Sequence, residues 1–297
     1  MKVNFFIVGP PRCASTSLSS FLDNHPDVCF ARPKEPTYFC PDTPAGYINM
    51  PRNITEYHER YFSHYDPLKH KLVGEGTPLY LMSDCAIQNI VDYNPDAKFI
   101  ALARNPIDIA YSMHATRYRV GNTHEDIADF EEAWHAQADR RAGKRVPENV
   151  VREAVLQYKK LASIGSQYEK LFSIVKNENI HVVVFDDLKK EPSEIKKGII
   201  EFLGLEKNPH NEIDHKEVNA SWKSEFSRNL YHITAQIASI SPWKPRLGLL
   251  NKIKSMFLKT SKRAEMRPEF RKQLQLEFQS ELVKLGEVLG RDFSHWK

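Results

Sequence analysis

Short apolar runs alternate along the chain with stretches of helical periodicity. The apolar runs predict strands at residues 5–8, 28–30, 98–103 and 181–185, and the segment 72–78 is predicted to be a short strand that ends in a loop. Apolar residues spaced three or four positions apart predict helices around residues 18–22, 83–94, 107–118, 151–175, 193–203 and 270–289. Strands that alternate with helices form parallel sheets, so the pattern predicts an α/β fold whose parallel sheet is flanked by helices on both faces.

The turn between the first strand and the first helix has the features of an anion site. The apolar run ends at Val8, a Gly/Pro turn follows, and the hydroxyl residues Ser15, Thr16 and Ser17 open the helical stretch. Free backbone N–H groups and the helix dipole both point at such a turn. The turn therefore favours a bound anion.

This turn differs from the loop that binds nucleoside triphosphates. Aligned on Gly9, the pattern G-x-x-x-x-G-K-[ST] has Ala14 at its second glycine and Ser15 at its lysine, while the cation Arg12 lies earlier. A kinase needs that lysine and a magnesium ion to neutralise the phosphates. The loop thus suits an anion of lower charge that needs no metal, such as a phosphosulfate.

Composition and charge narrow the class of protein. Among the 297 residues, 41% are hydrophobic and 27% are charged, which is typical of a globular protein. The net charge of +4 fits an anionic ligand but lacks the concentrated basic stripe of a nucleic-acid binder. No apolar stretch approaches the roughly 20 residues of a membrane span. The first apolar run is also too short for a secretory signal.

The cysteines give no metal or redox motif. They show neither C-x-x-C spacing nor a paired histidine, and they are Cys13, Cys29, Cys40 and Cys85. We therefore expect reduced thiols in the cytoplasm and no metal site.

Two segments together resemble the donor-binding elements of one enzyme family. Residues 12–18 (RCASTSL) resemble the 5′-phosphosulfate loop of the sulfotransferases that use 3′-phosphoadenosine 5′-phosphosulfate (PAPS), with Arg12 where lysine is commoner. The spacing Arg104-x7-Ser112 resembles the family's 3′-phosphate element, in which an arginine and a serine bind the ribose 3′-phosphate. A planar guanidinium suits that role because it forms bidentate bonds to phosphate oxygens.

The resemblance extends over nearly the whole chain and is closest to the bacterial and heparan-sulfate-type branch. Family-like segments occur at residues 75–80 (EGTPLY), 185–188 (FDDL), 202–205 (FLGL) and 289–296 (LGRDFSHW). Lysine is frequent in that branch at the position of Gly76, so a second substrate-side lysine is not expected there. The resemblance implies a single sulfotransferase domain over 1–297 with a P-loop-type fold, PAPS as donor, 3′-phosphoadenosine 5′-phosphate (PAP) as product, and no metal.

The resemblance also implies which residues bind the donor. The 5′ end of the donor is expected to contact Arg12, Cys13, Ala14, Ser15, Thr16 and Ser17, and the 3′-phosphate to contact Arg104, Ser112, Lys223 and Arg228. Arg12 is further expected to stabilise the charge that builds on the bridging and leaving oxygens.

Glu35 is the candidate general base. It matches the glutamate of the family's Lys-Glu-x-x-[FY]-[FY] segment, and two prolines hold its loop extended. A carboxylate near the acceptor can take the proton of the attacking group. Two alternatives stay open. Glu35 forms only a salt bridge with Lys34, or one of the histidines His58, His64 and His114 is the base.

Three further stretches bear on the acceptor and the closure of the site. The aromatic-rich segment 41–70 fits either the wall of a polar pocket or a helix packed by its aromatic face. The acidic residues at 125–132 favour either a cationic substrate or a solvated helix. The basic stretch 221–265 is a candidate helical lid over cofactor and substrate, and the alternatives are a surface that meets an acidic partner and a solvated helical face.

These observations predict in-line transfer of a sulfuryl group from PAPS to a hydroxyl or amine of a small-molecule acceptor. The acceptor is expected to be a natural product or another cytosolic metabolite, including guanidinium compounds, and a second copy of the chain is a candidate partner. Transfer to a carbohydrate is the alternative within the family. A small-molecule kinase with an altered phosphate loop and a nucleotide-binding scaffold without activity are the alternatives from other classes.

Overall fold

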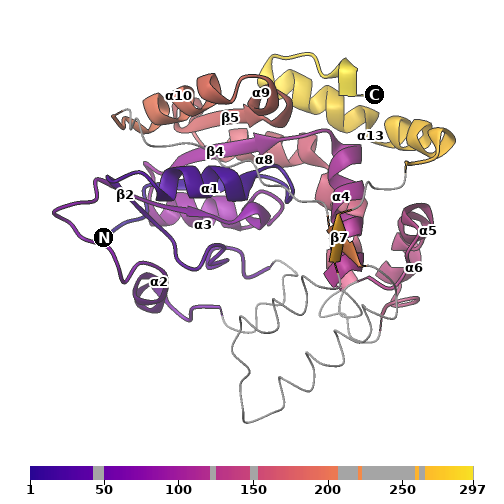
Figure 1. The fold of residues 1–297 in the computed structure, drawn as a ribbon, viewed down its shortest axis with the longest axis horizontal. Helices are drawn as coiled ribbons and strands as arrows, with labels where there is room; N and C mark the ends of the chain where they lie inside the picture. The colour runs from indigo at the N-terminus through magenta and orange to yellow at the C-terminus, as the bar shows by residue number, and fades with distance from the viewer. Residues whose placement is uncertain are drawn as a thin grey trace, which may run out of the picture. The chain divides into compact units, whose positions relative to one another are not determined.

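The protein is described by a computed structural model that covers residues 1–42, 50–120, 125–147, 153–206, 220–222, 258–260 and 265–296. Its central element is a five-stranded sheet in the order β2-β3-β1-β4-β5, in which every neighbouring pair is parallel. These strands are β1 (Phe5–Val8), β2 (Val28–Phe30), β3 (Leu72–Gly76), β4 (Lys98–Ala103) and β5 (Ile180–Val184). The predicted α/β fold with a parallel sheet is confirmed (Figure 1).

Helices and short 3-10 turns fill the segments between the strands. They are α1 (Ser15–Asp23), α2 (Ile54–Tyr61), η1 (Pro78–Tyr80), α3 (Ala86–Tyr93), α4 (Pro106–Val120), α5 (Phe130–His135), α6 (Gln137–Arg141), η2 (Glu153–Leu156), α7 (Tyr158–Ala162), α8 (Ile164–Ile174), η3 (Asn177–Asn179), α9 (Phe185–Lys190), α10 (Pro192–Leu203), α13 (Pro268–Leu289) and η4 (Ser294–Trp296). Among the described residues, no helix is both long enough and apolar enough to cross a membrane.

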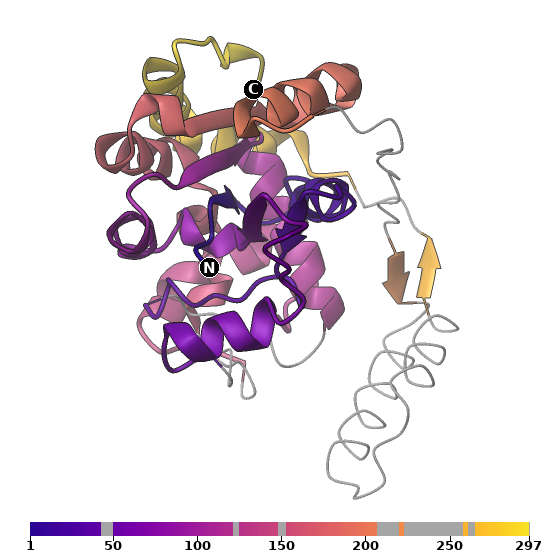
Figure 2. The same ribbon diagram turned by 90° about the vertical axis from the view of Figure 1, so that its left-hand side faces the viewer.

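The two faces of the sheet are covered by different helices. Helices α1 and α10 lie on one face, and α3 and α8 lie on the other (Figure 2). The register agrees with this arrangement, because Ile7, Ile100 and His181 are aligned across β1, β4 and β5, and a Cβ at Gly198 of α10 would contact the His181 ring. On the opposite face, the Phe6 ring stacks on Phe99 with centroids 5.8 Å apart. The sheet is thus buried on both sides, as its continuous apolar strands require.

Contacts divide the chain into two compact units. The first comprises residues 1–110, 159–215 and 272–297 and holds the sheet, while the second comprises residues 111–158 and 216–271. The prediction of one domain over 1–297 stays a prediction. In the second unit, β6 (Ala220–Trp222) and β7 (Leu258–Thr260) pair antiparallel. In the sequence, these strands fall near the two ends of the stretch 221–265, for which a helical lid was predicted. Most of that stretch lies outside the described residues, so the lid stays a prediction.

The second unit contains a buried ion pair. Arg140 and Glu125 both have fully buried side chains, and two guanidinium nitrogens donate to the two carboxylate oxygens over 2.8 and 2.7 Å. The hydroxyl of Tyr158 donates to the same carboxylate over 2.5 Å. Burial alone would raise the pKa of Glu125, but the bonds from Arg140 and Tyr158 lower it below its ordinary value. Glu125 is therefore held as a carboxylate.

The prediction of one long helix over 151–175 is wrong. The described part of this stretch forms η2, α7 and α8, and the chain leaves helical geometry at Ser163 before α8 begins. Glu281 of α13 accepts hydrogen bonds from the backbone N–H and the hydroxyl of Ser166, both over 2.8 Å. A Cβ at Gly165 would lie 2.1 Å from the Glu281 carbonyl oxygen, so α13 approaches closely there. Glu281, which is distant in sequence, thus accepts a backbone N–H in the first turn of α8. The apolar periodicity of 151–175 contains no information about such a contact.

Candidate active site

The predicted anion loop joins β1 to α1 at the carboxyl end of the central strand. Gly9 has φ 143°, and a Cβ there would lie 2.8 Å from the Leu102 carbonyl oxygen, so a side chain has no room. Arg12 and Ala14 adopt left-handed conformations with φ 72° and 67°. Ala14 provides no side-chain cap for α1, which leaves the first helical N–H groups available to a ligand. The local geometry is that of an anion-binding turn.

Arg104 brings the second predicted element to this loop. It follows β4 directly, and its Nη1 donates a hydrogen bond to the carbonyl oxygen of Arg12 over 2.5 Å. Its guanidinium lies over the Phe185 ring, 4.4 Å from the centroid. Its buried Nε has no hydrogen-bond partner in the part of the chain that the structure describes. A buried, unpaired N–H of a cation fits a phosphate oxygen.

The other predicted donor residues are placed as follows. Cys13 is buried in the loop. In the first turn of α1, Ser15 is buried, Thr16 is exposed and Ser17 is half-buried. Ser112 lies on α4 with its side chain almost fully buried. Lys223 and Arg228 lie outside the described residues. The roles assigned to all of these residues stay predictions.

Glu35 lies on a rigid loop beside the anion loop. Glu35 and Thr37 both have left-handed backbones, with φ 66° and 58°. The backbone N–H of Thr37 donates to Thr77 Oγ1 over 3.5 Å, and that of Phe39 donates to the Tyr80 hydroxyl over 3.4 Å. Non-glycine residues keep this backbone conformation only where their surroundings enforce it, and such residues cluster at functional sites.

Lys34 links the two loops, which the sequence did not reveal. Its Nζ lies 3.0 Å from Ser15 Oγ and 3.4 Å from Thr16 Oγ1. It also lies 3.4 Å from a carboxylate oxygen of Glu35, so the predicted salt bridge exists. The signal in the sequence was a lysine next to the candidate base on a proline-bounded loop. That signal did not say which way the side chain points.

The three histidines considered as alternative bases each contact another group of the protein through Nε2. His58 lies 3.0 Å from the Tyr93 hydroxyl, His64 lies 3.1 Å from the carbonyl oxygen of Phe30, and His114 lies 2.9 Å from that of Ile127. Burial lowers the pKa of all three rings. These contacts give each ring a structural role, and Glu35 stays the candidate base.

Several described residues of the aromatic stretch 41–70 pack into the core. Tyr57, Tyr61 and Phe62 are buried where α2 packs. The Tyr57 ring stacks on Tyr38 with centroids 4.8 Å apart. Of the two alternatives for this stretch, the described residues support the helix packed by its aromatic face. Residues 43–49 lie outside the description.

The acidic run has internal partners. Besides Glu125, Asp126 approaches Arg140 at 3.3 Å, and Asp129 caps α5 by accepting the N–H of Glu132 over 2.8 Å. The two remaining acids pair with arginines, Glu131 with Arg267 and Glu132 with Arg145. Ion pairs and a helix cap account for these carboxylates, so they give no support to a cationic substrate.

Glu75 begins the family-like segment 75–80, and its burial was not predicted from the sequence. It lies on β3 opposite Phe6, fully buried. Among the described residues, neither of its oxygens has a partner at hydrogen-bonding geometry. Burial raises its pKa to about 8, although the nearby hydroxyls of Tyr80 and Tyr57 lower it in part. Glu75 is therefore mostly protonated at neutral pH.

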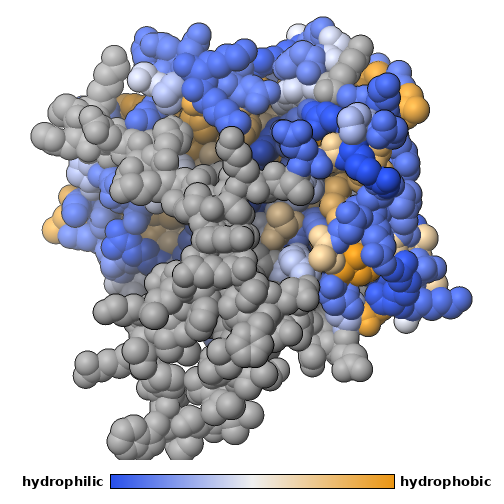
Figure 3. All heavy atoms as spheres, turned by 45° about the vertical axis from the view of Figure 1, so that its right-hand side comes forward, coloured by the Kyte–Doolittle hydropathy of each residue, from blue (hydrophilic) through white to orange (hydrophobic). Residues whose placement is uncertain are grey.

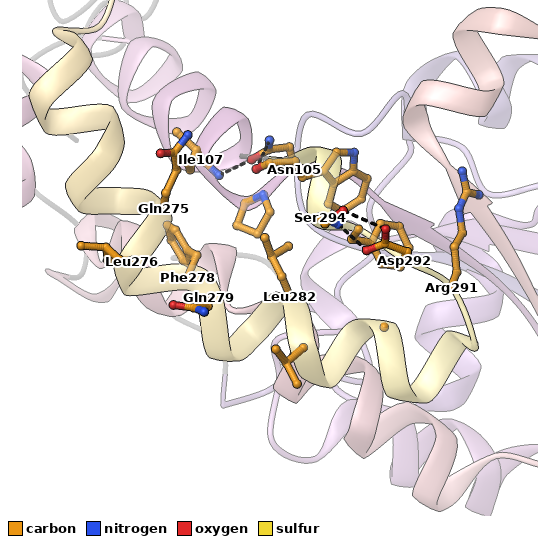
Figure 4. A pocket seen from close by; sticks show the side chains of 15 residues that line it. Asn105, Ile107, Gln275, Leu276, Phe278, Gln279, Leu282, Arg291, Asp292 and Ser294 are labelled. Atoms are coloured by element: carbon orange, nitrogen blue, oxygen red, sulfur yellow. Dashed lines mark hydrogen bonds between the residues drawn. The ribbon is translucent and has the colours of Figure 1, made fainter.

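The C-terminal segment packs beside the ends of β4 and β5. Trp296 Nε1 donates to Asp186 over 2.6 Å, and Asn105 Nδ2 donates to the Trp296 carbonyl oxygen over 2.9 Å. Here α13 and this segment enclose a cavity of about 520 Å³ (Figure 4). The residues that line it include Asn105, Leu282 and Phe293 but none of the predicted donor residues. The candidate site is therefore the loop region around Arg12, Lys34 and Arg104.

Two observations concern metals and the surface. In the described ranges, no three His, Cys, Asp or Glu side chains gather closely enough to hold a metal ion.

The face seen in Figure 3 is mostly hydrophilic where it is described, with apolar residues in separate spots. Leu276 and Val283 of α13 are the most exposed large apolar side chains of that helix, at 74% and 53%.

The parallel sheet, the turn after β1 and the arginine after β4 define an α/β protein with a P-loop-type turn at the carboxyl ends of its strands, the edge where such sheets bind ligands. A family model of the sulfotransferase domain matches residues 2–286. The chain belongs to the sulfotransferase family and is an enzyme of that class, which confirms the resemblance drawn from the sequence.

The chain is similar to individual sulfotransferases to different extents. A sulfotransferase structure from Alicyclobacillus acidocaldarius aligns over 100% of this chain and 99% of that chain with TM-score 0.69 and 22% identity, which shows the fold. The structure of mouse sulfotransferase SULT7A1 complexed with PAP aligns over 95% of this chain and 85% of that chain with TM-score 0.48 and 16% identity. The membrane-associated sulfotransferase kil1 of Dictyostelium discoideum is 29% identical over 112 residues, which are 37% of this chain and 22% of that protein.

Proposed function

We propose that the enzyme transfers a sulfuryl group from PAPS to a hydroxyl or amine of a small-molecule acceptor, with Glu35 as general base. The observation that carries the proposal is the hydrogen bond from Arg104 to the Arg12 carbonyl. This bond supports the proposal that the 3′-phosphate element and the 5′-phosphosulfate loop bind one nucleotide. The Nε of Arg104, which has no hydrogen-bond partner among the described residues, supports an anionic ligand at that position.

The reaction requires a base and an anion-stabilising loop. The acceptor oxygen or nitrogen attacks sulfur, and the bond between sulfur and the bridging oxygen breaks. The electron pair of that bond stays on PAP, and the proton of the acceptor passes to the Glu35 carboxylate. The first N–H groups of α1 and the Arg12 guanidinium stabilise the phosphate end of the donor.

The small-molecule class is part of the proposal. A polysaccharide acceptor that already carries sulfate groups is a polyanion, and its recognition favours a concentrated basic surface. The chain carries a net charge of only +4. We further propose that the enzyme acts in the cytoplasm, because all four cysteines are free thiols.

Thermal-shift and transfer measurements test the proposal. PAP is expected to raise the melting temperature, whereas ATP with magnesium is not. Labelled PAPS is then incubated with a panel of hydroxyl and amine metabolites and, as a matched alternative, with oligosaccharides. Stabilisation by ATP with magnesium alone would indicate the kinase. PAP binding without transfer to any acceptor would indicate the scaffold, and transfer to oligosaccharides alone would replace the proposed acceptor class.

A further inference from the structure

Lys34 occupies the position that the sequence of the anion loop leaves without a cation. In loops that bind nucleoside triphosphates, a lysine follows the second glycine, and this chain has Ser15 there. The Nζ of Lys34 lies 3.0 Å from the hydroxyl of that same Ser15. It lies 3.4 Å from the hydroxyl of Thr16, the next residue of the loop. An ammonium group from a different segment therefore lies at the first turn of α1.

The surroundings of Lys34 leave its charge incompletely compensated. Its side chain is only 21% exposed, and burying an ammonium group costs free energy unless anions pair with it. Two of its partners are neutral hydroxyls, and the Glu35 oxygen lies at 3.4 Å, near the upper limit of a hydrogen bond. Burial accordingly lowers the pKa of Lys34, and the pairing with Glu35 offsets this only in part. An additional anion beside this group would stabilise its charge.

We propose that Lys34 is a donor-binding residue that contacts the phosphosulfate oxygens of PAPS and replaces, from a second loop, the lysine that the anion loop lacks. This inference rests on the proposed function, since it names a further residue for the same reaction. An ammonium group has three donors, and two of those on Lys34 are engaged at 3.4 Å. When the donor binds, a phosphosulfate oxygen replaces the long contact with the Thr16 hydroxyl, and the contact with Glu35 is kept.

The same position gives Lys34 a role in the transfer step. When the bond between sulfur and the bridging oxygen breaks, that oxygen takes the electron pair and gains negative charge. The Lys34 ammonium donates a hydrogen bond to it, and such charge-assisted bonds strengthen as the acceptor becomes more anionic. The contact with Glu35 also keeps the base next to the bound donor. Lys34 thus connects the leaving group with the group that receives the proton.

Ligand affinities separate this role from one in which Lys34 only positions Glu35. PAP carries both a 3′- and a 5′-phosphate, whereas adenosine 3′-monophosphate lacks the 5′-phosphate. In isothermal titration, Lys34→Met is expected to weaken PAP binding about 10- to 100-fold, the range for losing a hydrogen bond to a charged group. The affinity for adenosine 3′-monophosphate is expected to change less than about twofold, because that ligand has no group near Lys34.

Matched variants and the remaining outcomes complete the test. Lys34→Arg keeps the charge and is expected to bind PAP better than Lys34→Met. Lys34→Gln removes the charge but keeps a donor, and serves where Lys34→Met does not fold. Lys71→Met removes an exposed lysine that pairs with Asp27 and is expected to match the wild type. Unchanged PAP affinity in Lys34→Met, or an equal loss for both ligands, would overturn the inference. A wild-type protein that does not bind PAP would instead remove the proposed function itself.

Discussion

The guanidinium group of Arg104 is hydrogen-bonded to the backbone carbonyl of Arg12, residues that are 92 positions apart in the sequence. The bond connects the turn after β1 with the turn after β4, two neighbouring strands of the parallel sheet. The cation-π contact with Phe185, at the start of α9, holds the guanidinium from the side of β5. Arg104 is therefore held between the turn after β1 and the Phe185 ring.

Replacing Arg104 tests whether the two loops bind one nucleotide. Arg104→Gln is expected to weaken PAP binding about 10- to 100-fold, because it removes a charged donor from the phosphate and the restraint on the loop. Isothermal titration measures the change. Arg32→Gln, which removes an arginine that is 60% exposed and paired with Asp23, is the matched control. Equal PAP affinities in wild type and Arg104→Gln would show that this residue does not bind the nucleotide.

Glu35→Gln tests the base. The amide keeps the shape of the side chain but cannot take a proton, so kcat is expected to fall about 10²- to 10⁴-fold. PAP affinity is expected to stay within about threefold, because the donor is bound by other groups. Stopped-time transfer assays with labelled PAPS and an accepted substrate give kcat. The control is Glu59→Gln, which removes an exposed carboxylate of α2. A kcat near the wild-type value in Glu35→Gln would mean that another group accepts the proton of the acceptor.

Glu75 makes stability depend on pH. The fold raises its pKa from 4.5 to about 8, so between these values the folded state keeps a proton that the unfolded state has lost. The free energy of unfolding is therefore not reduced by Glu75 below pH 4.5. As pH rises from 4.5 toward 8, Glu75 lowers it by roughly 1.4 kcal/mol per pH unit. Glu75→Gln removes this dependence. Urea titrations at several pH values measure the free energy of unfolding of both proteins. The value for the variant minus the value for the wild type is expected to increase from pH 5 to pH 7.5, by roughly 1.4 kcal/mol per pH unit.

The comparison for Glu75 is a glutamate that the fold leaves in solvent. Glu201→Gln removes a carboxylate that is 62% exposed on α10. The free energy of unfolding of this variant minus that of the wild type is expected to stay constant between pH 5 and pH 7.5. A constant difference for Glu75→Gln as well would mean that Glu75 is ionised in the folded protein.

The ion pair of the second unit is expected to dominate the stability of that unit. Glu125→Gln removes the buried carboxylate that pairs with the Arg140 guanidinium and leaves only Asp126, at 3.3 Å, as counter-charge, which is expected to cost about 3–5 kcal/mol. Glu132→Gln removes the exposed carboxylate that pairs with Arg145 and is expected to cost about 0–1 kcal/mol. Urea unfolding of both variants measures the two values. Similar losses would show that the buried pair contributes no more than a surface pair.

Much of the fold could be predicted because its signals are local. The strands at 5–8, 28–30 and 98–103 lie where their apolar runs predicted them, and Gly204 ends α10 with φ 73°. The long helix over 151–175 failed because Glu281, more than 100 residues away, caps the start of α8 at Ser166. The acidic run was likewise ambiguous, since its partners Arg140, Arg145 and Arg267 are not visible in its own spacing.

The sequence by itself determined the order of strands and helices, the anion loop after β1 and the family. These depend on apolar spacing and on turn residues that act within a few positions of one another. Only the tertiary structure decided that Arg104 reaches the Arg12 carbonyl, that Lys34 points at Ser15 and that Glu75 is buried. The parallel sheet gathers its carboxyl ends at one edge, but the direction of each side chain follows from packing between distant segments, which no local pattern encodes.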